Sequence, residues 1–172
     1  MSVSAPLILT VGIPGSGKST WAKNLAAQKA AQKKHYQIIS TDGIRAQLYG
    51  DEAIQGEWME IRRSLIHQLK AARQSIDQGR TTAVIYDATN AVRRQRREFI
   101  QLARSCRYTL LIAAWIDTPL AVCLRRNAER SRQVPAHIIE KMHRQLTASP
   151  PTEVENLDRI IRIRSDMLLE RK

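Results

Sequence analysis

The segment that most constrains this chain is Gly12–Ser19, which reads G-I-P-G-S-G-K-S. It fits the pattern G-x-x-x-x-G-K-[S/T] at every position, follows the apolar run 6–11 and precedes a stretch rich in Ala, Lys and Gln. A strand that ends in such a loop and leads into a helix aims several backbone N–H groups at one point, where the positive helix end adds to them. The segment therefore predicts a loop that binds the phosphates of a nucleotide.

The residues of this loop have separate expected tasks. We expect Lys18 to reach the β- and γ-phosphate oxygens and the Ser19 hydroxyl to bind Mg²⁺. ATP is the expected nucleotide, because the [N/T]-K-x-D motif usual in GTPases is absent from the sequence. The expected nucleotide-binding residues are Gly12, Pro14, Gly15, Ser16, Gly17, Lys18, Ser19 and Thr20.

Strand-like and helix-like segments alternate along the chain. Apolar and β-branched runs predict strands at 6–11, 36–40, 81–88, 108–117 and 157–165. Helical spacing predicts helices at 17–34, 44–49, 55–78, 92–104, 119–129 and 136–146. This alternation predicts an α/β fold with a parallel five-stranded sheet and helices on both faces. Together with the phosphate-binding loop, it is typical of a P-loop NTPase three-layer sandwich, and phosphotransferases of this type carry a small helical lid. We expect one domain over residues 1–172, with the lid at approximately 125–148.

Two polar segments follow predicted strands, and the ligand of such a sheet sits beyond the carboxyl ends of its strands. Asp42 comes after the second strand and can accept the proton of an acceptor hydroxyl, while Arg45, one helical turn on, can hold an acceptor phosphate. The alternative is that Asp42 caps a short helix and Arg45 is solvated. After the third strand, Asp87 is placed to hold Mg²⁺ through water, and Thr89 and Asn90 to touch an acceptor. The alternative there is a turn with Asn90 in a left-handed conformation.

The formal net charge of +12 predicts attraction to nucleic acid, nucleotides or an anionic membrane surface. Most of the cations are Arg, and two clusters stand out. The cluster R-R-Q-R-R at 93–97 is interpreted as a solvated face that attracts nucleic acid. The cluster R-R-N-A-E-R-S-R at 125–132 is interpreted as catalytic, because Arg126 and Arg130 are four residues apart and can share one helix face. Such arginines can neutralise charge that develops on a transferred phosphoryl group.

The segments G-I-P-G-S-G-K-S-T, S-T-D-G-I-R-A-Q-L, Y-D-A-T-N and R-R-N-A-E-R-S-R-Q-V-P together resemble the polynucleotide 5′-kinase family. This family is part of the adenylate-kinase-like branch of P-loop proteins. The resemblance implies that Asp42 is the general base for the 5′-hydroxyl group and that Arg45 contacts an acceptor phosphate. It also implies that Arg126 and Arg130 are lid arginines, and that Asp87 and Thr89 line the acceptor channel.

Three functions are consistent with these residues. The first is a kinase for the 5′-OH end of RNA or DNA, with Lys18, Asp42, Arg126 and Arg130 as catalytic residues. The second is a kinase for a small hydroxylated metabolite, nucleoside or antibiotic, and the third is a nucleotide-dependent switch without an acceptor.

Cys106 and Cys123 lie in apolar contexts and are expected to be core thiols. The sequence has no run of eighteen apolar residues, so we expect no membrane span and a cytoplasmic protein.

Overall fold

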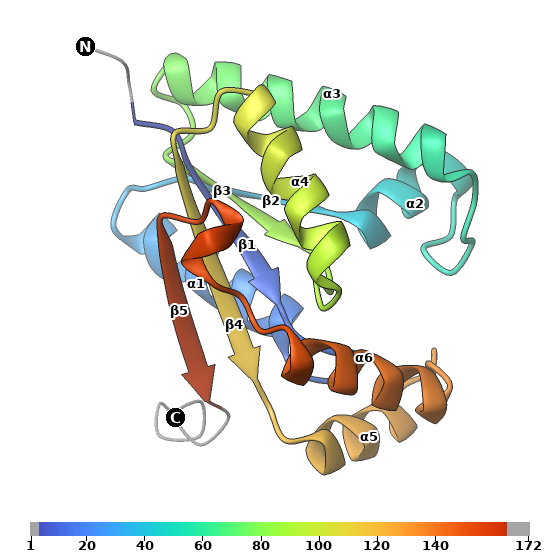
Figure 1. Cartoon of the computed structure of the whole chain (residues 1–172). Helices are drawn as coiled ribbons and strands as arrows, with labels where there is room; N and C mark the ends of the chain where they lie inside the picture. The colour runs from blue at the N-terminus through green and yellow to red at the C-terminus, as the bar shows by residue number, and fades with distance from the viewer. Residues whose placement is uncertain (1–3, 165–172) are drawn as a thin grey trace.

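Five parallel strands form the central sheet of the computed structural model, which describes residues 4–164 (Figure 1). The strands are β1 (Pro6–Val11), β2 (Tyr36–Ser40), β3 (Ala83–Asp87), β4 (Leu110–Asp117) and β5 (Arg159–Arg164). Their order across the sheet is β2-β3-β1-β4-β5, and each neighbouring pair is parallel. The predicted strands are confirmed, with ends that differ by about two residues at most. The last residue of the predicted fifth strand, Ser165, lies outside the described residues.

Helices follow the first four strands, as the alternation predicted. They are α1 (Lys18–Ala31), α2 (Thr41–Tyr49), α3 (Trp58–Asp77), α4 (Arg93–Ser105), α5 (Leu120–Ala128) and α6 (Ala136–Ala148), with the 3-10 turn η1 (Glu153–Glu155) before β5. Helix α2 begins three residues earlier than expected, because the Ser40 side chain accepts a hydrogen bond from the Gly43 N–H at 2.9 Å and caps it. Helix α3 ends as expected beside Gly79, whose φ of 70° closes the last turn.

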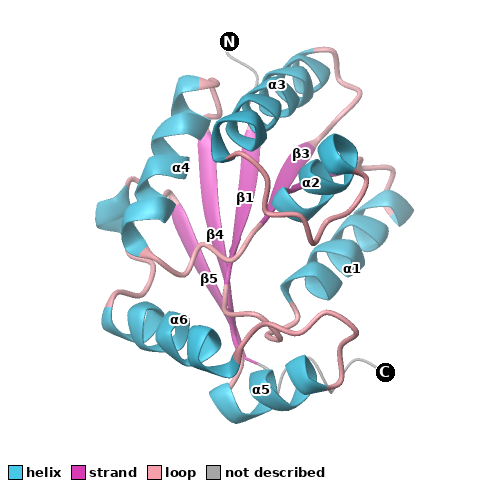
Figure 2. Cartoon of the chain, turned by 90° about the vertical axis from the view of Figure 1, so that its right-hand side faces the viewer, coloured by secondary structure: helices cyan, strands magenta, loops and turns pink. Residues whose placement is uncertain are grey.

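The helices lie on both faces of the sheet, which gives the three layers of the predicted sandwich (Figure 2). Alternate residues of β1 point to opposite faces. Leu7 and Leu9 join the larger core cluster with α3 and α4, whereas Ile8 joins a smaller cluster with α1. Buried β-branched and apolar strands of this kind are typical of a parallel sheet that is covered on both sides.

All loops that carry the predicted polar motifs leave the sheet at one edge, because the strands are parallel. Helices α5 and α6 lie beyond this edge (Figure 1). The carboxyl ends of β1, β2 and β3 therefore face the α5–α6 segment, which is the arrangement on which the candidate site depends.

Cys106 and Cys123 are buried and unpaired, as expected. Among residues 4–164, no helix combines the length and the apolar character needed to cross a bilayer.

Candidate phosphotransfer site

A cavity of about 830 Å³ lies at the carboxyl edge of the sheet and joins the phosphate-binding loop to α2 and to the α5–α6 segment. Its size is in the range of known small-molecule sites. From the loop and the start of α1 it is lined by Pro14, Gly15, Gly17, Lys18, Ser19 and Thr20. Gly12 and Ser16, also predicted to bind the nucleotide, are buried residues of the loop and are not part of the lining.

The path of the loop depends on glycine at two positions. Gly15 and Gly17 have φ values of 82° and 98°, in the left-handed region that other residues rarely adopt. A Cβ atom on Gly15 would lie 2.4 Å from the Cys123 carbonyl oxygen, so the loop packs directly against α5. The Arg126 guanidinium lies 3.4 Å from the Gly15 carbonyl oxygen on the same side. The loop is therefore held in shape by the segment that follows β4.

Lys18 is the first residue of α1, and its ammonium group folds back over the loop. Its Nζ donates a hydrogen bond to the Ile13 carbonyl oxygen at 3.0 Å. Burial lowers the pKa of Lys18 to about 8, because the loop excludes water from the charge, and the nearby Asp87 carboxylate opposes this shift. A phosphate group at the loop would supply the negative charge that this partly dehydrated cation lacks.

Asp42 and Arg45 lie opposite the loop and line the same cavity. Arg45 Nη1 donates to Asp42 Oδ1 at 2.8 Å, so the predicted pair points the same way along α2. Ser40 caps the helix, which rules out the alternative that Asp42 does so. The Asp42 side chain is 56% exposed and Arg45 only 16%, and Arg45 Nε is buried without a hydrogen-bond partner among the described residues.

The end of β3 supplies the floor of the cavity. Asp87 and Thr89 line it, and the Thr10 hydroxyl lies 3.2 Å from Asp87 Oδ1 and 2.9 Å from the Ala88 carbonyl oxygen. The structure does not support the prediction that Asn90 touches an acceptor. It is buried, has φ 48°, and its side-chain amide donates to the Thr10 carbonyl oxygen at 2.8 Å, so it shapes the turn and is not part of the lining.

Arg126 and Arg130, the predicted lid arginines, are not arranged on one helix as expected. Helix α5 ends at Ala128, so Arg126 and Arg130 do not share a helix face. Arg126 lies beside the carbonyl oxygens of Gly15 and Ser16, whereas Arg130 follows the helix and lines the cavity. Arg130 is close enough to Lys18 to contribute to the lowering of its pKa. One arginine therefore supports the loop and the other faces the cavity.

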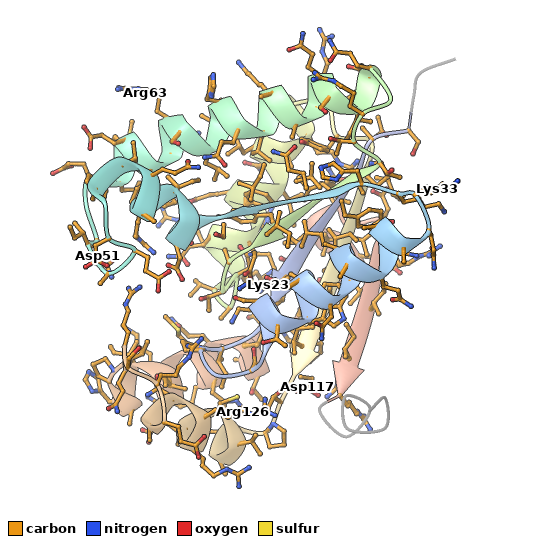
Figure 3. The ribbon with its side chains drawn as sticks, turned by 180° about the vertical axis from the view of Figure 1, so that it is seen from behind. Lys23, Lys33, Asp51, Arg63, Asp117 and Arg126 are labelled. Carbon is orange, nitrogen blue, oxygen red and sulfur yellow. The ribbon has the colours of Figure 1, made fainter. Side chains whose placement is uncertain are left out.

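The α5–α6 segment reaches across the cavity to the loop after α2. Arg132 Nη1 donates to the Glu52 carbonyl oxygen at 3.0 Å, and both residues line the cavity. Figure 3 shows the two parts of the chain that this contact joins: the loop after α2, where Asp51 is labelled, and the α5–α6 segment, where Arg126 is labelled. Sequence reasoning did not find this bridge, since no local pattern indicates a contact across 80 residues.

The most important residue that the sequence interpretation missed is Arg96. The sequence predicts it within a solvated cluster, yet it is fully buried and forms a bidentate ion pair with the buried Glu155 at 2.7 and 2.8 Å. It also donates to the carbonyl oxygens of Asn90 and Ser149, each at 2.9 Å. Arg96 therefore joins the turn after β3 to the end of α6. A signal was present, because Arg96 precedes the buried Phe99 and Ile100 by three and four residues.

The donor set of the cavity suits Mg²⁺ better than a transition metal. The residues available are the Ser19 hydroxyl and the Asp87 carboxylate, both oxygen donors that line the cavity. Within residues 4–164 there is no group of three or more His, Cys, Asp or Glu side chains that could hold a metal. Mg²⁺ is commonly held by one or two protein oxygens together with waters and substrate phosphates, which agrees with this set.

Comparison with known proteins identifies the family. Residues 7–149 match the protein family described as "AAA domain", a match that includes every residue of the cavity wall. The chain belongs to this AAA domain family. Its fold is that of the P-loop kinases, so the resemblance to polynucleotide 5′-kinases is supported here at the level of that broader group.

One curated relative and two solved structures illustrate the likeness. The chain is 30% identical over 137 residues to the L-seryl-tRNA(Sec) kinase of Methanococcus maripaludis, and the match covers 80% of this chain. The match covers 51% of that relative, so the chain spans about half of its length. Kti12 of Chaetomium thermophilum, solved with ADP-AlF3, gives a TM-score of 0.62 at 16% identity, covering 94% of this chain and 90% of Kti12.

The second structure is the APS kinase CysC of Mycobacterium tuberculosis, solved with AMPPNP and APS. It gives a TM-score of 0.60 at 17% identity and covers 96% of this chain and 91% of that one. At such identities the two structures establish the shared fold alone.

Proposed function

We propose that this AAA domain protein is a kinase that transfers the γ-phosphoryl group of ATP to a hydroxyl group of a nucleic acid. The observation that carries the proposal is that one cavity is lined both by the phosphate-binding loop and by the Asp42–Arg45 pair. A nucleotide switch needs the loop but has no use for an exposed carboxylate on the opposite wall. A phosphotransferase needs both.

The proposed reaction is an in-line displacement at the γ-phosphorus of ATP. The acceptor oxygen forms a bond to that phosphorus while the bond to the β,γ-bridging oxygen breaks, and its electron pair leaves with ADP. The acceptor proton passes to the Asp42 carboxylate. Lys18 and Arg130 stabilise negative charge on the phosphate oxygens, and Arg45 orients Asp42 and holds an acceptor phosphate.

The remaining predicted residues have supporting roles in this proposal. Ser19 and Asp87 would hold Mg²⁺, which neutralises phosphate charge when it is bound. Thr89 contacts the acceptor from the end of β3. Arg126 keeps the loop in shape through its contact with the Gly15 carbonyl oxygen. The α5–α6 segment acts as the lid, and the whole chain works as a single kinase domain.

Two hydroxyl groups are the leading acceptors within this class. One is the 5′-OH end of RNA or DNA, which the resemblance to polynucleotide 5′-kinases suggests. The other is a hydroxyl attached to tRNA, in keeping with the name of the L-seryl-tRNA(Sec) kinase that the chain resembles. The net charge of +12 favours a polyanionic acceptor in both cases.

A small-molecule acceptor is the second candidate. It is favoured by the bridge from Arg132 to the Glu52 carbonyl oxygen, which spans the cavity and would narrow the way in for a large acceptor. A metabolite, nucleoside or antibiotic could be enclosed behind it.

The test is a transfer assay with γ-labelled ATP and Mg²⁺. The acceptors are 5′-OH RNA, 5′-OH DNA, seryl-tRNA, and a panel of nucleosides and sugars. Label on a nucleic acid, lost in Lys18→Ala and Asp42→Ala, supports the proposal. Label only on a small molecule overturns it in favour of the second candidate. ATP hydrolysis without any acceptor, unchanged in Asp42→Ala, contradicts both.

A further inference from the structure

The first turns of α4 carry a group of exposed arginines that the proposed reaction does not use. Arg93, Arg94 and Arg97 are exposed and surround a shallow hollow of about 480 Å³, completed by Glu98 and Gln101. Glu98 is the one carboxylate in this lining, and its ion pair is with Arg94 at 3.0 Å. The α4 surface, defined by these three arginines, therefore keeps a net positive charge.

The α4 surface is fixed close to the candidate site. Helix α4 begins six residues after Asp87, and the buried Arg96 ties its first turns to the turn after β3 and to the end of α6. Figures 1 and 2 both show that the start of α4 lies at the edge of the sheet that faces α6. A chain that leaves the cavity on the side of Thr89 and α6 would therefore meet the α4 surface.

The composition of this helix is not what helix stability requires. The first turn of α4 contains no acidic residue, although an acidic side chain there would be favoured by the helix dipole and arginine is not. Arg96 accounts for one arginine of the cluster by its buried contacts. Within residues 4–164, the exposed three make no contact of this kind with the core, and the surface ion pair of Arg94 with Glu98 is the one structural partner of their charge.

We propose that Arg93, Arg94 and Arg97 form a docking surface for the phosphodiester backbone of an RNA whose end enters the cavity. The proposal rests on the proposed function, because it assumes that the acceptor hydroxyl belongs to a nucleic acid. Exposed guanidinium groups suit phosphate, since each offers several donors in a planar fork. Contacts of this type position a nucleic acid without reading its sequence.

The test compares two triple variants that remove the same charge. The first is Arg93→Gln/Arg94→Gln/Arg97→Gln. The matched control is Lys33→Asn/Lys34→Gln/Arg80→Gln, at exposed positions near the amino ends of β2 and β3, with Lys33 at the far end of α1 (Figure 3). Asn is chosen at position 33 because its φ of 59° is left-handed, which Asn tolerates.

Two measurements use single-stranded 5′-OH RNA of about 20 nucleotides, and both include a dinucleotide as the short acceptor. In the first, the logarithm of the binding constant is followed against the logarithm of salt concentration. Loss of three phosphate contacts should reduce the slope by about 2 in the α4 variant only. In the second, the KM for long RNA should rise in the α4 variant, while the KM for ATP and the KM for the dinucleotide stay unchanged.

The outcomes separate this inference from the proposed function. Equal salt slopes in the α4 variant and the control overturn the docking surface, even if both transfer phosphate to RNA. An equal rise in the KM for dinucleotide also overturns it, because that acceptor is too short to reach α4. A reduced slope in the α4 variant, with no transfer from wild type to any nucleic acid, supports the surface and overturns the proposed function.

Discussion

The two walls of the cavity are built in opposite ways. On the nucleotide side, Gly12, Ile13 and Ser16 are buried, and the loop carbonyl oxygens of Ile13 and Ser16 accept hydrogen bonds from Lys18 and Thr118. On the acceptor side, residues 51–57 are all exposed, and Ile44 is the one buried residue of α2. The nucleotide wall is thus part of the core, whereas the acceptor wall is a short helix and a surface loop.

This difference explains why family membership and fold indicate that the site binds a nucleotide but do not indicate which acceptor it binds. A loop that packs against α5 and β4 cannot change without cost to the core. An exposed loop can change with little cost to stability. The identity of the acceptor therefore depends on side chains that the fold does not constrain.

On the nucleotide wall, the largest effect is expected from Lys18→Met. Removing the ammonium group should lower kcat/KM for ATP by about 10²–10³-fold, the usual loss for one preorganised donor at developing charge. The folded protein without ATP should melt no lower than wild type, because burial makes the charged lysine costly. Lys23→Met, on the exposed face of α1 (Figure 3), is the matched control and should leave kcat/KM unchanged. A lower melting temperature in Lys18→Met would show that the wall needs this lysine for stability.

The next effect concerns the junction between the walls. Arg96→Met leaves Glu155 buried without its partner and should lower the free energy of unfolding by about 3–5 kcal/mol, measured by urea denaturation. Arg96→Met/Glu155→Leu removes both charges and should recover part of this loss, while the Asn90 and Ser149 carbonyl oxygens still lack their donor. If the free energy of unfolding of the single variant lies within about 1 kcal/mol of that of wild type, the ion pair is not what joins the turn after β3 to α6.

The contrast between Arg96 and the strands shows what sequence could and could not predict. The five strands and the phosphate-binding loop follow from apolar runs and from glycine spacing, because both are local properties. The sequence interpretation of Arg96 as solvated is wrong, because four arginines within R-R-Q-R-R indicate a surface segment. Its burial is explained by Glu155, an ion-pair partner 59 residues away in the sequence. The end of α5 was predicted to within one residue, but Arg130 lies two residues beyond it, so the four-residue spacing from Arg126 does not give a shared helix face. Asp42 and Arg45 were predicted to point the same way, and they do.

A pH dependence tests the nucleotide wall alone. Lys18 has its pKa lowered to about 8 in the folded protein, so above that pH the free enzyme loses the charge that attracts phosphate. We expect kcat/KM for ATP to fall by about tenfold per pH unit above pH 8. Lys18→Arg should be less active, but its profile of kcat/KM against pH should not bend near pH 8, because arginine stays protonated. A wild-type profile that is flat to pH 9.5 would mean that Lys18 does not contact the nucleotide as a cation.

Deprotonation of Lys18 should have opposite effects on the stability of the folded protein and on ATP binding as pH rises. Its folded pKa of about 8 lies below the ordinary value of 10.5, so between these pH values the unfolded chain holds a proton that the folded chain has lost. The contribution of Lys18 to stability therefore increases as pH rises through this window, while ATP binding weakens. Opposite trends in melting temperature and ATP affinity would tie both to this residue.

The smallest effect is expected at the bridge between the lid and the acceptor wall. Arg132→Ala removes the hydrogen bond to the Glu52 carbonyl oxygen, worth about 0.5–1.5 kcal/mol. If the acceptor is RNA, opening this bridge should lower the KM for RNA by less than about tenfold and leave the KM for ATP unchanged. A rise in KM for the acceptor would indicate that the bridge closes over it, as the small-molecule alternative requires.

Asp42→Asn shows whether the Asp42 carboxylate serves the acceptor or the nucleotide. ATP affinity and phosphoryl transfer are measured on the same preparation. The variant should bind ATP as wild type does, while kcat for transfer should fall by about 10²–10⁴-fold, the usual contribution of a general base. Transfer at nearly the wild-type rate, or loss of ATP binding together with transfer, would contradict the proposed role of Asp42 toward the acceptor.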